Sequence, residues 1–262
     1  MGGVGRTRTA VFWWLSAMAI CSTLFLAIPE LDLHVSGWFG TPSGFPLSES
    51  LLLEGVRNFM LLATGGVAYL ALILLVLRNF FKKLQVLNAR FLVFVVTCAA
   101  LGPGIIVNGL LKRFSGRVRP RNTDVFGAEG TFSPFLDFTG ACGSNCSFVS
   151  AEASALATIT AVLVISVIPY LPTSVRPRVQ IGVLSVATFG SLLRVIVGAH
   201  YLSDVLFAWL IIFPMVFGLC LAFGRPRLLS SVEAARLSST EPAPILVHPP
   251  IETNSSGRFK SL

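Results

Sequence analysis

The chain has 262 residues, of which 54% are hydrophobic and 12% charged, and its formal net charge is +8 at pH 7. Soluble domains carry about 25% charged residues, so this composition excludes an ordinary water-soluble globular protein. The basic residues are concentrated between long apolar runs, which explains the positive charge without a nucleic-acid-binding surface.

Six apolar runs each approach the roughly 20 residues that a helix needs to cross the hydrocarbon core of a membrane. In chain order they cover residues 11–28, 57–77, 91–111, 148–171, 180–198 and 201–224. The first run is longer than the apolar part of a signal peptide and has no clear cleavage site after it, so we interpret it as an uncleaved anchor. The sequence predicts an all-α integral membrane protein, a bundle of six transmembrane helices over residues 11–224.

The segments outside these runs differ in character. Within residues 29–56, the second half from residue 47 is expected to lie flat on the membrane surface. Residues 120–146 are long, irregular and rich in glycine, and we expect them to cover a functional site, a bare connector being the alternative. Residues 1–10 are expected to be a short cytoplasmic N-terminus, and residues 225–262 a disordered cytoplasmic tail.

The distribution of basic residues predicts the orientation of the bundle, because cytoplasmic loops are enriched in lysine and arginine. Segment 29–50 has no lysine or arginine. Thirteen basic residues lie on the other side: Arg6, Arg8, Arg78, Lys82, Lys83, Arg90, Arg176, Arg178, Arg225, Arg227, Arg236, Arg258 and Lys260. Both termini are therefore predicted to be cytoplasmic, and segment 120–146 extracytoplasmic.

Two of the five cysteines lie on the predicted extracytoplasmic side, where disulfides form. Cys142 and Cys146 are four residues apart, just before the fourth apolar run. A disulfide between them would hold the preceding loop against the start of that helix, and two free thiols are the alternative. Cys21, Cys98 and Cys220 lie inside apolar runs and are expected to be packing residues.

A first charged cluster follows the third run. Lys112 and Arg119 are seven residues apart, close to two helical turns, so both would face one pocket if the helix continued. Gly116 and Pro120 oppose a continuous helix. The two cations suit a phosphate group, and the alternative is a set of interfacial anchors for lipid headgroups.

A second cluster opens the fourth run. Asn145 or Ser147 is expected to cap the helix, whose first amides would bind a phosphate. Ser150 would add a hydroxyl donor. Glu152 has two possible roles: a proton donor and acceptor in catalysis, or a carboxylate that pairs with arginine or with the helix dipole.

A third cluster lies around the last two runs. His200 and Asp204 are four residues apart, so we expect them on one helix face, with the carboxylate holding one imidazole nitrogen protonated and leaving the other free to attack. Arg194 lies upstream in apolar sequence, where a charge is costly and marks function. A structural His–Asp pair with an arginine reaching the interface is the alternative.

The predicted topology brings all three clusters to the extracytoplasmic face, which favours a single phosphate-handling site. A metal or other cofactor is not expected. The chain has only three histidines, His34, His200 and His248, and no close set of histidine and cysteine ligands.

These clusters resemble the motifs of the type 2 phosphatidic acid phosphatase (PAP2) family, a group of metal-independent membrane lipid phosphatases. The family motif K-x6-R-P matches Lys112–Pro120 in full. The motif S-R-x5-H-x3-D matches at Arg194, His200 and Asp204, whereas Leu193 replaces the serine.

The remaining family motif, P-S-G-H, keeps only its serine in Val149-Ser150-Ala151-Glu152. The family's histidine at the last position protonates the leaving group, and here Glu152 occupies that place. The stretch from Asn145 to Ser150 followed by Glu152 resembles a bacterial subgroup related to lipid A phosphatases.

The resemblance implies that His200 attacks phosphorus, that Asp204 orients it, and that Lys112, Arg119, Ser150 and Arg194 bind the phosphate. It further implies a phosphatase in a bacterial inner membrane, with a periplasmic site and a phosphorylated lipid as its partner. Lipid A, at the 4′ or 1 position, is the first expectation. Undecaprenyl diphosphate, phosphatidylglycerol phosphate, phosphate transfer to another lipid, and a non-catalytic lipid-phosphate-binding protein are the alternatives. The sequence leaves the oligomeric state open.

Overall fold

The structure is a computed structural model that describes residues 2–229, with side chains from residue 8 onward. Most of the predicted tail, from residue 230 on, lies outside the described residues. Within the described part, six helices are long and apolar enough to cross a membrane, which confirms the predicted all-α multi-pass membrane fold. They span Arg8–Ala27, Leu51–Leu77, Ala89–Phe114, Ala151–Tyr170, Arg176–Ile196 and Leu202–Ala222.

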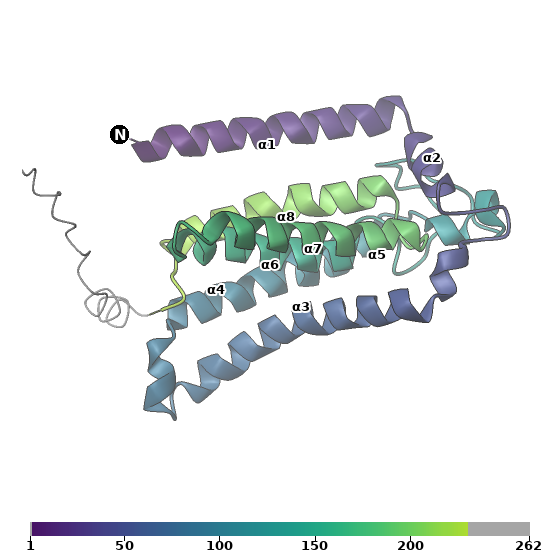
Figure 1. The fold of residues 1–262 in the computed structure, drawn as a ribbon. Coiled ribbons are helices and arrows are strands. Elements are labelled where there is room, and N and C mark those ends of the chain that lie inside the picture. Colours follow the sequence, from purple (N-terminus) through teal and green to yellow (C-terminus); the bar gives the residue numbers. More distant parts are fainter. Residues whose placement is uncertain (1, 230–262) are drawn as a thin grey trace, which may run out of the picture. The chain divides into compact units, whose positions relative to one another are not determined.

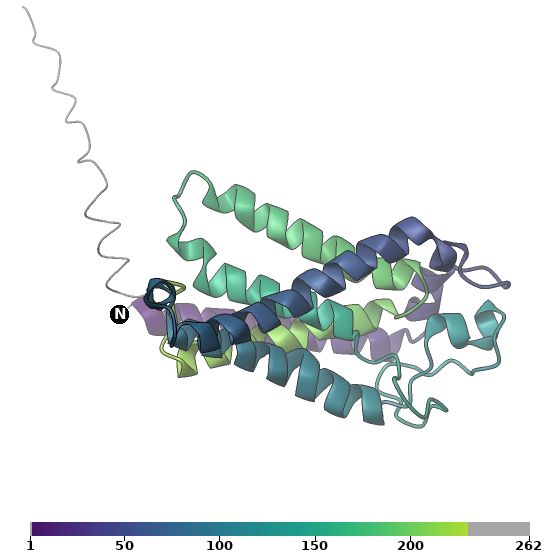
Figure 2. The same ribbon diagram turned by 90° about the horizontal axis from the view of Figure 1, so that it is seen from below.

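The long helices lie side by side, and their connections gather at the two ends of the bundle (Figures 1 and 2). One end holds the short helix α2 (Leu31–Gly37) and the long loop after α5 (Lys112–Phe114). The other end holds the connection from α3 (Leu51–Leu77) to α4 (Ala89–Ala99). All three charged clusters fall at or beside the first of these ends.

Several helix boundaries differ from the sequence-based expectation. The first helix begins at Gly2 rather than at residue 11, so it includes most of the segment expected to be a separate N-terminus. Residues 51–56 do not lie flat on a membrane surface but form the first turns of α3, because Ser50 caps that helix by accepting a hydrogen bond from the Leu53 amide at 3.5 Å. Helix α7 (Arg176–Ile196) begins four residues early, since a proline is tolerated in a first helical turn. Helix α6 (Ala151–Ser166) begins three residues late.

The third membrane-spanning helix changes its winding at its centre. Helix α4 continues as η3 (Ala100–Leu111), a π-helix that contains Pro103. Proline cannot donate a backbone hydrogen bond and crowds the preceding turn, so the wider winding accommodates it. The Asn108 side chain also donates to the Pro103 carbonyl, at 2.7 Å.

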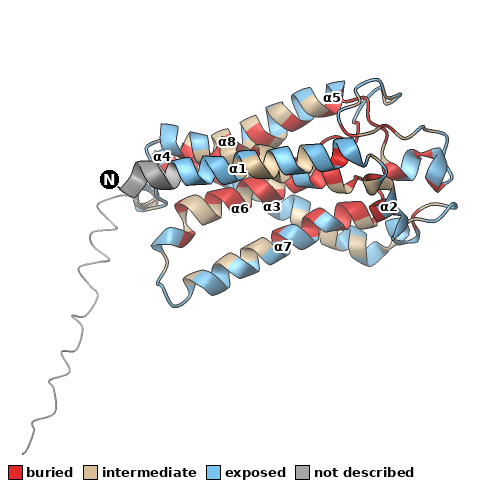
Figure 3. Ribbon diagram, turned by 90° about the horizontal axis from the view of Figure 1, so that it is seen from above, coloured by how far each residue is buried: buried red, intermediate tan, exposed pale blue. Residues whose placement is uncertain are grey.

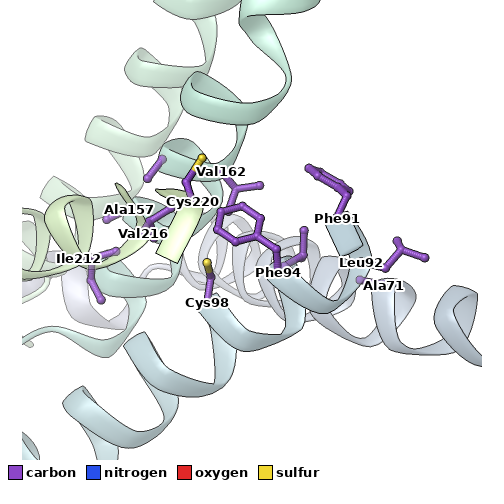
Figure 4. Packing of buried hydrophobic residues seen from close by; sticks show 12 residues of the cluster. Ala71, Phe91, Leu92, Phe94, Cys98, Ala157, Val162, Ile212, Val216 and Cys220 are labelled. Carbon is purple, nitrogen blue, oxygen red and sulfur yellow. The ribbon is translucent and has the colours of Figure 1, made fainter. Parts of the chain in front are cut away.

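Two apolar clusters hold the bundle together. One is built around Phe94 and Cys98 of α4, which pack near Val162 of α6 and Val216 of α8 (Leu202–Ala222), as Figure 4 shows. The other lies nearer the loop end and includes several phenylalanines, among them Phe135, whose ring stacks on another at 4.2 Å. Figure 3 shows buried stretches along α6 and α8, whereas α1 (Gly2–Ala27) is largely exposed, as expected of a helix that faces lipid.

Candidate active site

Asp204 lies at the centre of a network of donors at the start of α8. It is fully buried, and its Oδ1 accepts a hydrogen bond from Arg117 Nη1 at 2.7 Å. Its Oδ2 accepts from Ser147 Oγ at 2.5 Å and from the Tyr201 amide at 2.9 Å. Four groups including His200 therefore hold this carboxylate in one orientation.

His200 contacts this carboxylate but does not share a helix with it. The helix begins at Leu202, so His200 belongs to the preceding turn, and the expected placement of both residues on one helix face is wrong. The pair still meets, with His200 Nδ1 lying 3.5 Å from Asp204 Oδ2. That distance is an ionic contact rather than a short hydrogen bond. Nδ1 is thus the ring nitrogen paired with the carboxylate, and Nε2 is the candidate nucleophile.

The turn that carries His200 is shaped by the end of α7. Gly198 adopts a left-handed conformation with φ +64°, which L-residues rarely adopt. The amides of Ala199 and His200 both donate to the Arg194 carbonyl, at 3.0 and 3.1 Å, so the chain folds back over the last helical turn. Phe45 packs against Gly198 so closely that a Cβ would lie 2.4 Å from its ring.

His200 is 2% exposed, and its burial lowers its pKa to about 4. The contact with Asp204 opposes this shift, whereas the positive charges of Lys112 and Arg119 add to it. The imidazole is therefore neutral at pH 7, which is the protonation state required of a nucleophile.

Lys112 and Arg119 meet through a residue that the sequence analysis treated only as a helix cap. The helix ends at Phe114, so the two cations do not lie on one continuous helical face. Instead, Lys112 Nζ donates to Asn145 Oδ1 at 3.1 Å, and Arg119 Nη2 donates to the same oxygen at 2.8 Å. The shared acceptor brings both cations to one point.

The cap of α6 is also assigned to a different residue. Ser150, rather than Asn145 or Ser147, is the N-cap, and its hydroxyl accepts from the Ala153 amide at 3.3 Å. A hydroxyl that accepts one hydrogen bond can still donate another, so Ser150 can still act as the hydroxyl donor that the sequence predicts. Ser147 instead donates to Asp204, as described above.

Glu152 pairs with two arginines. Arg57 Nε donates to both carboxylate oxygens, at 3.0 and 3.2 Å, and Arg194 Nε lies 3.2 Å from Oε2. This geometry matches the arginine-pairing role that the sequence left open for Glu152. Arg57, which no sequence motif marks, therefore belongs to the site.

Arg117 and Asp32 were missed as well. Arg117 is 1% exposed and bridges two carboxylates, with Nη2 at 2.7 Å from Asp32 Oδ2 and Nη1 at 2.7 Å from Asp204 Oδ1. Burial opposes its charge, but Asp204 and Asp32 outweigh that effect and raise the pKa of Arg117. Arg117 lies inside the first motif, in a stretch that also contains Arg113 and Arg121, and this density of arginines is the signal that could have identified it. No local sequence pattern identifies Asp32.

The disulfide that the sequence left open is present. Cys142 and Cys146 are joined, with their Cα atoms 5.7 Å apart, and the bridge closes a five-residue ring that contains Asn145. Among the described residues, no group of three or more histidine, cysteine, aspartate or glutamate side chains is arranged to hold a metal ion.

The chain matches one protein family and several named proteins. Residues 91–227 match the PAP2 superfamily, a stretch that contains every predicted site residue. The chain belongs to the PAP2 superfamily. The lipid A 4′-phosphatase of Rhizobium leguminosarum is 29% identical over 216 residues, covering 76% of this chain and 89% of that protein.

Further PAP2-type relatives carry similar names. The lipid A 4′-phosphatase of Rhizobium etli is 30% identical, over 76% of this chain and 80% of that protein. The lipid A 4′-phosphatase of Francisella tularensis subsp. novicida is 27% identical, over 72% of this chain and 84% of that protein. No solved structure matches the chain.

Proposed function

We propose that this PAP2 protein is a membrane phosphatase that hydrolyses a phosphate monoester of lipid A on the periplasmic side, through a phosphohistidine at His200. The relatives named lipid A 4′-phosphatase favour the 4′ position. The observation that carries the proposal is the neutral, buried His200, oriented by Asp204 and placed within electrostatic range of Lys112 and Arg119.

The reaction consists of two displacements. In the first, Nε2 of His200 bonds to phosphorus, the bond from phosphorus to the sugar oxygen breaks, and that oxygen takes up a proton. In the second, water bonds to phosphorus and gives up a proton, the bond to Nε2 breaks, and inorganic phosphate leaves. Lys112, Arg119 and Arg194 stabilise the oxygens of the phosphoryl group in both steps, with Ser150 as a further donor.

Asp204 supports both displacements by stabilising positive charge on the imidazole. When Nε2 carries the phosphoryl group, the ring gains positive charge, and the carboxylate 3.5 Å from Nδ1 offsets it. The donors around Asp204 prevent it from turning away, so the histidine is held in one tautomer.

Glu152 is the residue proposed to exchange the proton with the sugar oxygen, and its ion pairs support a second role, in which it holds Arg194. Glu152→Gln separates the two. If Glu152 donates the proton, turnover of a monoester falls about 10²–10⁴-fold, whereas a lipid diphosphate with a better leaving group is still hydrolysed. If it only holds Arg194, both substrates are affected alike.

An apolar cavity supports a lipid as the substrate. It measures about 860 Å³, lies between α3, α4, η3 and α6, and is lined mainly by leucine, valine and alanine side chains. Glu152 and Ala151 are part of its lining, so the cavity reaches the charged site. A lipid whose phosphate occupies the site therefore has an apolar surface for its acyl chains.

The distribution of basic residues between the two ends of the bundle supports the proposed orientation in the membrane. The end of the bundle that holds the α3–α4 connection carries the basic residues of segment 78–90, and the site lies at the other end (Figure 1). Because cytoplasmic loops are rich in lysine and arginine, the proposed site faces the periplasm of a bacterium and the protein resides in its inner membrane.

The test is mass spectrometry of lipid A from a Gram-negative host that expresses the chain, with His200→Ala as the control. Loss of one phosphate with the intact chain alone is expected, and fragmentation identifies the 4′ or 1 position. Unchanged lipid A would refute this substrate. Undecaprenyl diphosphate and phosphatidylglycerol phosphate would then be assayed with the purified protein, and no turnover of either would favour a lipid-phosphate-binding protein.

A further inference from the structure

Asn145 occupies an unusual position among the phosphate-site residues. Its side-chain oxygen accepts from both Lys112 Nζ, at 3.1 Å, and Arg119 Nη2, at 2.8 Å. Its main-chain carbonyl accepts from Arg119 as well, at 3.0 Å from Nη2 and 3.3 Å from Nε. One residue therefore fixes the positions of two cations that repel each other.

The backbone at Asn145 is held from both sides. The Cys146 amide donates to the Lys112 carbonyl at 3.2 Å, and the Cys142 amide donates to the Gly116 carbonyl at 2.9 Å. The disulfide joins the same two cysteines across the turn. Asn145 itself has φ +50°, a left-handed conformation that asparagine and glycine adopt more readily than other residues.

This arrangement leaves donors free for a ligand. A lysine ammonium has three N–H donors and an arginine guanidinium has five, so both cations can keep Asn145 and bind a phosphate together. The amide oxygen is neutral, and it therefore orients the cations without cancelling the charge that attracts the anion.

We propose that Asn145 is a positioning residue that holds Lys112 and Arg119 in their phosphate-binding arrangement, and that the Cys142–Cys146 disulfide keeps it in place. The proposal rests on the proposed function in that the bound group is the substrate phosphate. Reduction of the disulfide releases the turn, so phosphate affinity depends on the redox state of a pair that lies outside the catalytic groups.

The left-handed backbone makes matched substitutions possible. Asn145→Gly allows the same backbone conformation and removes the side chain that carries the shared oxygen, while the main-chain carbonyl that Arg119 contacts remains. Asn145→Asp keeps the shape and the conformation but places a carboxylate between the cations, where it competes with phosphate. Ser144→Ala, in the same ring and without a side-chain hydrogen bond to the cations, is the control.

The experiment measures the binding of inorganic phosphate to the purified full chain in detergent, from the shift of its melting temperature, beside KM and kcat on the lipid substrate. The wild type and Ser144→Ala are expected to bind phosphate equally. Asn145→Gly should bind several-fold more weakly, because both cations lose a charge-assisted hydrogen bond. Asn145→Asp should bind about tenfold or more weakly, because its carboxylate competes with phosphate for the same cations. KM should rise in the same order, with smaller changes in kcat.

The disulfide is tested by reduction. Reductant is expected to weaken phosphate binding by the wild type, whereas the Cys142→Ser/Cys146→Ser double variant should bind weakly from the start and not respond. Thiol labelling verifies that the bridge has opened.

If Asn145→Asp binds phosphate as tightly as the wild type, the positioning role of Asn145 is wrong. Aspartate has the same shape as asparagine, so a residue with only a structural role could be replaced by it without effect on phosphate binding. Unchanged binding after verified reduction would overturn the role of the disulfide. A wild type that binds phosphate but hydrolyses no lipid phosphate would refute the proposed function alone, because the variants still report on phosphate binding. A wild type that neither binds nor hydrolyses would refute both.

Discussion

Arg117 offers the sharpest test of the buried network, because its guanidinium lies between two buried carboxylates. Its side chain is 1% exposed, as is that of Asp32, while Asp204 is fully buried. Arg117→Met keeps most of the apolar contact and removes the charge. Breaking a buried pair by removing one partner destabilises a protein by about 3–5 kcal/mol, because the partner's charge is left uncompensated.

The assay is thermal unfolding of the purified protein in detergent. At about 2–4 °C per kcal/mol for a chain of this size, the melting temperature of Arg117→Met should fall by about 10 °C. Arg113→Met is the matched control, since Arg113 lies in the same stretch but is exposed. Adding Asp32→Asn to Arg117→Met should restore part of the loss, because one of the two unpaired charges is then removed. A melting temperature equal to that of Arg113→Met would refute the reasoning.

The site supports four further predictions. Because His200 has a pKa of about 4 instead of 6.5, kcat/KM should stay level from pH 7 to about 5 and fall only as His200 becomes protonated near pH 4; a midpoint near 6.5 would contradict its burial. The unfolded state binds the His200 proton below pH 6.5 and the folded state only near pH 4, so stability should fall as the pH drops from 6.5 to 4, and less so in His200→Gln. Gly198→Ala should lower the melting temperature and the activity together, because the added Cβ would clash with Phe45 and because φ at this position is +64°. An unchanged melting curve would contradict the strain expected at this turn. Ser147→Ala should lower kcat with little change in KM, because it removes a donor to Asp204 and no phosphate contact, as steady-state kinetics would show.

The membrane helices could be predicted from the sequence because each one is a local feature. The expected run of residues 201–224 and the observed helix Leu202–Ala222 differ by one or two residues at each end. Hydropathy says less about where a helix starts when the flanking residues are apolar too, which is why Leu51 to Val56 were assigned to the membrane surface. The winding change at Pro103 was not predicted, since a proline inside an apolar run is compatible with a kink, a break or a wider helix.

The candidate site could be predicted only as far as its residues share a motif. Lys112, Arg119, Arg194 and the His200–Asp204 pair were found by spacing. Their partners were not, because the contacts join residues that are far apart in the chain: Arg57 and Glu152 are separated by 95 positions, and Asp32 and Arg117 by 85. Such pairs leave no local pattern, and only the packing of α2 and α3 against the site brings them together.

These long-range partners share one property that bears on how the site works. Lys112 and Arg119 bind the amide oxygen of Asn145, and Arg194 pairs with Glu152. Each cation assigned to the phosphate therefore already has an acceptor in the protein. The acceptors differ in charge, since one is a neutral amide and the other a carboxylate.

That difference divides the site into two halves with different responses to a phosphate. Lys112 and Arg119 together have more N–H donors than the Asn145 oxygen can accept from. A phosphate could therefore bind both cations without displacing Asn145. At Arg194 it approaches a guanidinium already paired with Glu152, so the two anions compete for it. Arg57 donates to both oxygens of the same carboxylate, so Glu152 would keep a partner if Arg194 bound the phosphate instead. In the proposed function, an arginine outside the family motifs is thus the partner of the carboxylate that stands where the family has a histidine.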